Sequence, residues 1–293
     1  RSPHVDFLSS PYSYGYRWVG GEGGFMSPEA SVRRAGKLWI SEEDMRTHLW
    51  RPNSFYGQTR NTRETVEVLK RQLANILTHG AGAWWCDWSY QEGGAYAEPE
   101  VMAVFRRFLE LGRQYLALPD RSSAAEIAVV FDAETSFYRS TLNNYDIPNW
   151  RQRAWGYARM GAPYDGVLLS DLLEGRAREY KLYIFGDAFH LSGEQRRALK
   201  SILRRDRKMA LWIYAPGFVD DDLNVEHCYD LTGIRLGQTN RQWSANLYIT
   251  NFEHPITRNL PTTTVWGTDM RLGPLFTVAD PDITVLGTVV INQ

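Results

Sequence analysis

Three carboxylates stand side by side directly after a short apolar segment of this chain. Glu42, Glu43 and Asp44 follow "KLWIS", which has the composition of a buried strand. Barrel enzymes that cleave glycosidic bonds with retention hold a carboxylate nucleophile and a carboxylic acid about 5 to 5.5 Å apart, at the ends of two strands. Glu42 stands where such a nucleophile would lie. A solvated acidic turn is the competing interpretation, and Glu43 and Asp44 compete with Glu42 for the same role.

The sequence contains 11 Trp and 16 Tyr, many of them in segments that otherwise read as loops. Exposed aromatic rings are the surfaces on which sugar rings stack, although a large core also consumes aromatic residues. His48 has no companion at metal-ligand spacing, so we expect a supporting or surface residue, no metal and no cofactor. Cys86 and Cys228 lie far apart beside apolar residues, which predicts buried free thiols.

Composition excludes several classes of function. The formal charge of −1 is spread over 293 residues without a basic stripe, so we expect no nucleic-acid partner. No apolar run approaches the roughly 20 residues that span a bilayer, and the first residues lack the pattern of a signal peptide. We therefore expect a soluble protein without a membrane partner, in a compartment that the sequence leaves open.

Residues 1–118 alternate strands and helices three times. Strands are expected over 5–10 and 37–41 and in "GAWWCDWS"; helices are expected over 30–35, from the Asn61 cap to Gly80, and from 101 to 111. This order predicts a parallel sheet, and long loops after the strands are typical of the functional end of a (β/α)8 barrel. A whole barrel needs about 250 residues. We therefore expect the last three βα units of a TIM barrel, completed by another segment or another chain.

Residues 119–293 begin with a polar linker and restart the alternation. Strands are expected over 127–131, 182–185 and 210–214, with a helix opened by Ser192 and Gln195. These are the units of a doubly wound, flavodoxin-like α/β domain. The remainder, from about Gly233, is β-rich and stops at "TVVINQ" in what reads as the middle of a strand.

Three segments resemble a known family. "VDFLSSPYSYGYR", "GKLWISEEDMRTHL" and "GAWWCDWS" are similar to strands six, seven and eight of clan A glycoside hydrolases of the β-galactosidase superfamily. Residues 125–290 resemble the β-galactosidase trimerisation domain, whose fold is like that of class I amidotransferases. The resemblance implies a retaining β-glycosidase with a carbohydrate substrate, and self-association, with a trimer as one form.

The resemblance also implies roles for single residues. In "GKLxxxExDxRTHL" the Glu is the nucleophile, which is Glu42 here, and the same motif matches Asp44 and Arg46. Tyr12 matches a hydroxyl that holds the nucleophile, and Tyr14 could serve instead. The matched aromatic floor and hydroxyl-binding group of strand eight are the three residues Trp85, Asp87 and Trp88.

Two features of the resemblance stay open. If Trp85 faces the barrel lumen then Trp84 belongs to the core, and a slip of one residue reverses the two. The acid/base Glu of this clan comes from strand four, to which nothing in this sequence corresponds. The second domain has no cysteine at the strand-to-helix elbow, which disfavours amidotransferase chemistry. A carbohydrate-binding or oligomerisation protein without catalysis is the alternative from another class.

Overall fold

The computed structural model describes residues 2–87, 93–140, 156–205 and 208–292. The chain forms two compact units. The first unit contains residues 1–130 and 150–183, and the second contains residues 131–149 and 184–293. The two units are defined by contacts in space. The domain boundary predicted after residue 118 was drawn along the sequence, and it stays a prediction.

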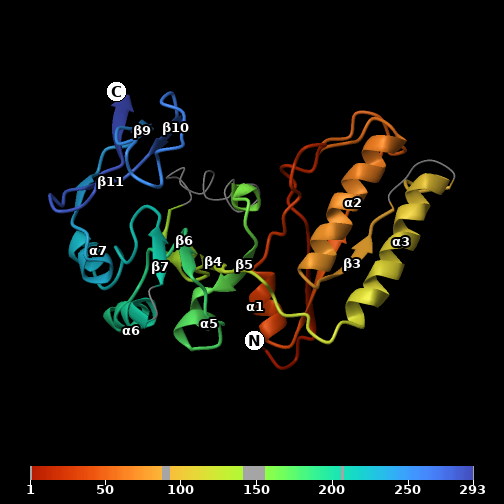
Figure 1. Ribbon diagram of the computed structural model, residues 1–293, viewed down its shortest axis with the longest axis horizontal. Coiled ribbons are helices and arrows are strands. Elements are labelled where there is room, and N and C mark those ends of the chain that lie inside the picture. Colours follow the sequence, from red (N-terminus) through yellow and green to blue (C-terminus); the bar gives the residue numbers. More distant parts are fainter. Residues whose placement is uncertain (1, 88–92, 141–155, 206–207, 293) are drawn as a thin grey trace. The chain divides into compact units, whose positions relative to one another are not determined.

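A three-stranded parallel sheet opens the first unit (Figure 1). Its strands are β1 (Phe7–Pro11), β2 (Leu38–Glu43) and β3 (Gly82–Trp85), paired in the order β1-β2-β3. Each strand is followed by a helix, namely α1 (Glu29–Arg34), α2 (Thr62–Thr78) and α3 (Pro99–Leu116). The threefold β-loop-α order is confirmed. No further strand joins this sheet in the described part of the chain, so the structure contains a parallel sheet and no closed barrel.

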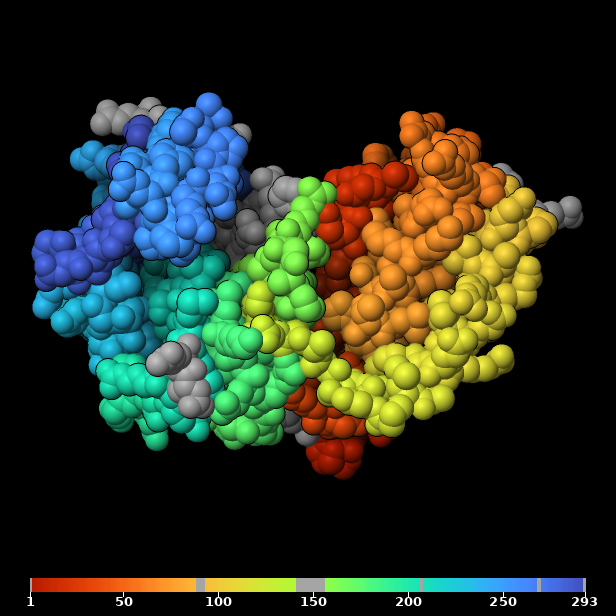
Figure 2. Space-filling model, in the orientation of Figure 1, coloured from red at the N-terminus to blue at the C-terminus, as the bar shows by residue number. Residues whose placement is uncertain are grey.

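One face of this sheet packs on α2 and α3. Period-two alternation sends Ala83 and Trp85 of β3 to this face, where they join the apolar side of α2, including Leu69 and Leu73. The Trp85 ring meets Phe105 of α3 edge to face, with centroids 5.0 Å apart. The two helices meet along their length and form the orange and yellow surface of this unit in Figure 2.

The opposite face of the sheet is open. Its apolar side chains include Phe7, Leu38 and Trp84, which are 56%, 46% and 45% exposed. Their register explains why they share a face, because Phe7 pairs with Leu38 and Glu42 pairs with Trp84. One face of this sheet is therefore packed on helices, and the other carries partly exposed apolar side chains.

A second sheet has the strand order β5-β4-β6-β7. Its strands are β4 (Ile127–Phe131), β5 (Tyr164–Leu168), β6 (Leu182–Phe185) and β7 (Met209–Trp212). The helices described in this region are η1 (Thr135–Tyr138), η3 (Tyr157–Arg159), α5 (Leu169–Leu173), α6 (Gly193–Arg204) and α7 (Val225–Thr232). Numbered along the chain, the strands of this sheet lie in the order 2-1-3-4, which is the order of flavodoxin-like, doubly wound sheets. The α/β class with parallel sheets is therefore confirmed.

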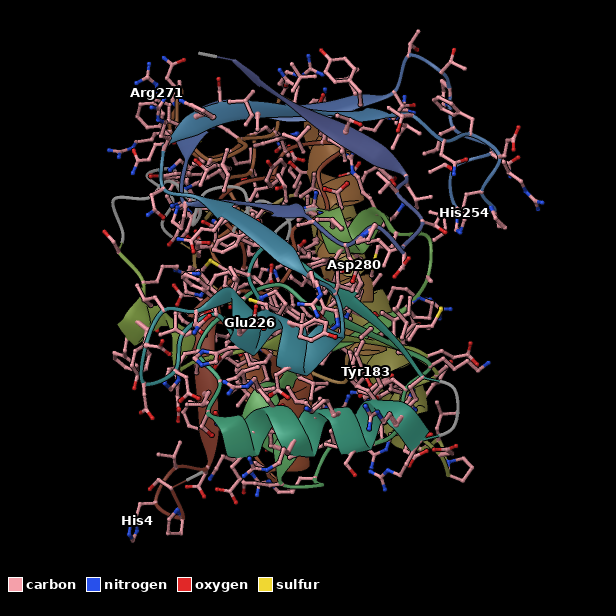
Figure 3. All side chains as sticks on the ribbon, turned by 90° about the vertical axis from the view of Figure 1, so that its left-hand side faces the viewer. His4, Tyr183, Glu226, His254, Arg271 and Asp280 are labelled. Carbon is pink, nitrogen blue, oxygen red and sulfur yellow. The ribbon has the colours of Figure 1, made fainter. Side chains whose placement is uncertain are left out.

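Five strands complete the second unit. β9 (Trp243–Ile249) lies between β10 (Val265–Leu272) and β12 (Gly287–Asn292), and β8 (Leu236–Thr239) pairs with β11 (Leu275–Val278). All of these pairs are antiparallel. Figure 3 shows the β8–β11 pair beside α7, which carries Glu226, and shows His254 and Arg271 at opposite ends of the β9–β10 hairpin. No helix of the described part is long and apolar enough to cross a membrane.

Candidate active site

Glu42 lies on the open face of the first sheet, at the carboxyl end of its central strand. The strand was expected to end at Ser41, but parallel pairing continues on both sides, and Glu42 pairs with Pro11 and with Trp84. Its carboxylate is half-buried, and the Cys86 thiol donates to its Oε1 over 3.6 Å. A carboxylate held in this way can attack an electrophilic carbon placed over the sheet end.

Glu43 points to the opposite face and is fully buried against α2. Its Oε1 accepts from the Ser41 hydroxyl at 2.7 Å and from Gln72 Nε2 at 3.4 Å. Burial raises the pKa of Glu43 to about 7, although both hydrogen bonds act in the opposite direction. Alternation along β2 therefore separates the two adjacent glutamates, with Glu42 on the open face and Glu43 in the interior.

Tyr12 and Tyr14 enclose a buried arginine. The Arg17 guanidinium lies 4.0 Å from each ring centroid, donates to the backbone oxygens of Ser13 (3.0 Å) and Tyr12 (2.7 Å), and forms an ion pair with Asp44. These contacts tie the loop after β1 to Asp44 and so fix the path of that loop.

Different glutamates raise the pKa values of the two tyrosines. Burial raises the pKa of Tyr12, and the nearby Glu43 charge adds to this. Burial also raises the pKa of Tyr14, where Asp44 and Glu42 add to the effect and Arg17 opposes it. Among the described residues neither tyrosine forms a hydrogen bond with Glu42, and Tyr14 is the one whose pKa the Glu42 charge raises.

Asp44 joins two arginines. Its Oδ2 lies 3.3 Å from Arg46 Nη1, while its other oxygen faces Arg17. The Arg46 guanidinium lies 4.8 Å above the centroid of the Trp50 ring and is 18% exposed. The structure therefore brings Arg46 to the rim of the same sheet end as Glu42, oriented by a carboxylate and an indole.

The two residues after Arg46 form hydrogen bonds with α2 and with the loop that precedes α3. The Thr47 hydroxyl donates to the backbone oxygen of Ala95 at 2.6 Å. The two ring nitrogens of His48 contact the Thr65 hydroxyl (2.8 Å) and Glu98 (3.0 Å). His48 thus has the supporting role expected of it. No cluster of three or more potential metal ligands occurs within the described ranges.

The structure adopts the second of the two frames considered for strand eight. Trp85 packs on α3, while Trp84 shares the open face with Glu42 and donates from Nε1 to Ser9 Oγ over 3.4 Å. Asp87 accepts from the Ala95 backbone N–H at 2.9 Å, which shapes the loop that follows. Trp88 lies outside the described residues. Trp84 is therefore an aromatic side chain on the same face as Glu42, whereas Trp85, which was matched to the aromatic floor, lies on the helix face; the expectation for Trp88 stays a prediction.

The sequence left Trp84 open as an alternative to Trp85 and gave no role at this sheet end to Cys86 or Tyr56. Trp84 pairs with Glu42, and Cys86 lies two residues further along, so alternation puts both on the face of Glu42. The sequence alone does not say which face of the sheet is packed on helices. Tyr56 lies in a distant loop, and its ring meets that of Tyr14 with centroids 5.0 Å apart. Tyr56 is 54% exposed and pairs with Tyr14 between the loops that follow β1 and β2.

Comparison with known proteins gives a likeness of fold. No protein-family model and no curated protein matches this chain. Among solved structures it is similar to a catalytic mutant of a GH42 β-galactosidase from G. stearothermophilus, with a TM-score of 0.58 and 11% sequence identity over 97% of this chain. The match covers 42% of that protein, so this chain spans less than half its length. A putative ThuA-like protein from Bacteroides uniformis matches 59% of this chain and 72% of its own, at 13% identity and a TM-score of 0.38.

At such low identity the first likeness shows that the chain has a fold like that of part of a glycoside hydrolase. The second likeness carries no argument.

Proposed function

We propose that this chain is the carboxy-terminal part of a retaining, β-galactosidase-like glycoside hydrolase, with Glu42 as the nucleophile. The observation that carries the proposal is the place of Glu42. It lies half-buried at the carboxyl end of a central parallel strand, on the open face, beside Trp84 and within the electrostatic reach of Tyr14. Carboxyl ends of parallel strands are where barrel enzymes build their active sites.

The open sheet face supports completion by further strands. Large contiguous apolar surface and unpaired strand edges are costly in a soluble protein. Phe7 and Leu38 would be covered if five further βα units closed the sheet into a (β/α)8 barrel. In this proposal those units, including the strand with the acid/base Glu, come from residues outside this sequence or from another chain. The predicted module 119–293 would then pack on the barrel and mediate self-association, as a homo-oligomer such as a trimer.

The proposed reaction is a double displacement on a β-glycoside. A Glu42 oxygen attacks the anomeric carbon while the bond to the leaving oxygen breaks and the acid/base residue supplies a proton to that oxygen. Water then attacks the glycosyl ester, gives a proton to the same acid/base residue and releases Glu42. Tyr14 and the Cys86 thiol would orient the carboxylate, and Trp84 and Tyr56 would offer ring faces to the sugar.

The test uses the full-length polypeptide that contains this chain and a panel of nitrophenyl β-glycosides. We expect Glu42→Gly to lose activity by several orders of magnitude, roughly 10⁴-fold or more, as nucleophile removal does in other enzymes. Added azide should then attack from the vacated side and give a glycosyl azide of inverted configuration. The parent enzyme should release sugar of retained configuration, read by NMR.

Glu43→Gln is the matched control, because it removes the adjacent carboxylate from the buried face. It should fold and keep most of the activity. If Glu43→Gln abolishes hydrolysis while Glu42→Gly remains active, the assignment of the nucleophile is wrong. If the parent cleaves no glycoside, the alternative of a carbohydrate-binding or oligomerisation protein replaces the hydrolase.

A further inference from the structure

The second compact unit contains a cavity that the proposed hydrolase chemistry does not use. Its volume is about 460 Å³, within the range of small-molecule sites. Part of its lining comes from the segments that follow three strands of the second sheet: Arg139 after β4 and η1, Phe189 after β6 and Tyr214 after β7. β4 and β6 are neighbours from which the chain departs in opposite directions. The cavity therefore lies at the topological switch point, where doubly wound sheets bind ligands.

Buried hydrogen bonds hold two of these segments together. The Thr135 hydroxyl donates to Asp132 Oδ2 at 2.5 Å and accepts from the backbone N–H groups of Phe189 and His190, both at 3.1 Å. The backbone N–H of Asp132 donates to Asp187 Oδ1 at 3.1 Å. The Tyr138 and His190 rings stack 3.6 Å apart. These contacts fix the loop after β4 against the loop after β6, so the cavity is preformed.

One side of the cavity is lined by aromatic rings that are inclined to one another. The ring of Phe276 on β11 meets Tyr214 at 87° and Phe218 at 70°, and Tyr214 meets Phe189 at 71°. Phe189 and Phe218 are buried. Rings inclined to one another in this way offer single faces and no parallel slot, which suits a puckered ring better than a flat heterocycle clamped on both sides.

The polar lining of the cavity includes three carboxamides and one guanidinium, beside the hydroxyl-bearing side chains of Tyr138, Ser140 and Tyr214. Gln238, Asn240 and Gln242 are exposed and line it, and Gln238 Nε2 donates to Asn240 Oδ1 at 2.5 Å. Among the described contacts this hydrogen bond leaves the side-chain oxygen of Gln238 able to accept and the side-chain nitrogen of Asn240 able to donate. Amides both donate and accept, as hydroxyl groups do. No acidic side chain occurs among the described lining residues, and Arg139 is the one cationic side chain there.

We propose that this cavity binds a neutral saccharide ring, with an apolar face of the sugar on Phe276 and Tyr214 and its hydroxyls on Asn240, Gln242 and Arg139. A cation would need carboxylates, and a multivalent anion would need more than one arginine. A wholly apolar ligand would leave three carboxamides unpaired. The site shares no residue with the sheet end around Glu42, so saccharide binding here is independent of glycoside hydrolysis.

The test is saturation-transfer NMR and titration calorimetry with methyl pyranosides and disaccharides at up to about 10 mM, the range of weak sugar sites. To isolate this cavity the protein carries Glu42→Gln and Trp84→Ala, which remove the carboxylate and indole proposed to hold sugar at the other site. We expect binding that each of Asn240→Ala and Gln242→Ala weakens by roughly tenfold. Asn259→Ala, an exposed amide in the loop between β9 and β10, is the matched control and should leave binding unchanged.

Three results would overturn the proposal. The first is that no saccharide of the panel binds the doubly substituted protein, and the second is that Asn240→Ala and Gln242→Ala leave the affinity unchanged. The third is that a nucleobase or an aromatic carboxylate binds in the cavity and the saccharides do not. None of these results bears on hydrolysis of nitrophenyl glycosides, so the two proposals fail separately.

Discussion

Glu43→Gln should stabilise the first compact unit, and increasingly so as the pH rises. The carboxyl group of Glu43 has its pKa raised by burial from an ordinary 4.5 to about 7. Between these values the folded state holds a proton that the unfolded state has released, so the free energy of unfolding falls as the pH rises. The rise in pKa corresponds to about 3 kcal/mol. Gln has the same shape and no charge, so the variant should not show this loss.

The difference in the free energy of unfolding between the variant and the parent should grow with pH. The variant should exceed the parent by about 1 kcal/mol near pH 5 and by about 3 kcal/mol near pH 8, because the parent ionises completely only above its folded pKa. Hydrogen exchange of the α2 and β2 amides, read by mass spectrometry, reports the opening free energy of this unit alone. Other titrating groups cancel in the difference between the two proteins.

Glu42→Gln supplies the control, because Glu42 is half-buried and on the open face. It should change the opening free energy by less than about 0.5 kcal/mol. A difference between Glu43→Gln and the parent that does not vary with pH would refute the reasoning. So would a variant less stable than the parent at high pH, since it would mean that the buried carboxylate is favoured by its surroundings.

Three further outcomes follow from buried contacts. Arg17→Met should lower the urea-unfolding free energy by about 3 kcal/mol or more, since it leaves Asp44 without its buried partner; a loss under about 1 kcal/mol would contradict the buried ion pair. Ser192→Ala should cost about 1 kcal/mol by removing the side-chain acceptor that caps α6, measured by exchange of the α6 amides, with exposed Ser201→Ala as control. Cys228 is fully buried and its pKa is raised by burial to about 11, so iodoacetamide should label it only after unfolding. Rapid labelling of the native protein would show that α7 opens readily.

For residues 1–118 the sequence was sufficient for the elements and their order, whereas β5, α5 and α7 were not expected as separate elements. Strong helical periodicity and caps such as Asn61 and Ser192 marked where helices begin, and the caps are present in the structure. Apolar runs alternating with these helices indicated parallel sheets. Local patterns are enough here because caps and periodicity depend on neighbours a few residues apart.

A closed barrel is not formed by the described residues, since β1, β2 and β3 pair only with one another. What the described residues show is a sheet with an exposed apolar face, on which Phe7 and Leu38 lie. A three-stranded sheet fits into a barrel or into an open sheet, and the residues of these strands do not distinguish the two.

The sequence by itself determined that Glu42 and Glu43 point to opposite faces, as do Trp84 and Trp85, because alternation in a strand is strictly periodic. Only the tertiary structure decided which member of each pair is interior. That choice is made by the packing of α2 and α3, which bury Glu43 and Trp85 and leave Glu42 and Trp84 together on the open face. The cavity of the second unit is likewise decided by tertiary structure, since loops after three different strands and the distant ring of Phe276 meet only when the chain is folded.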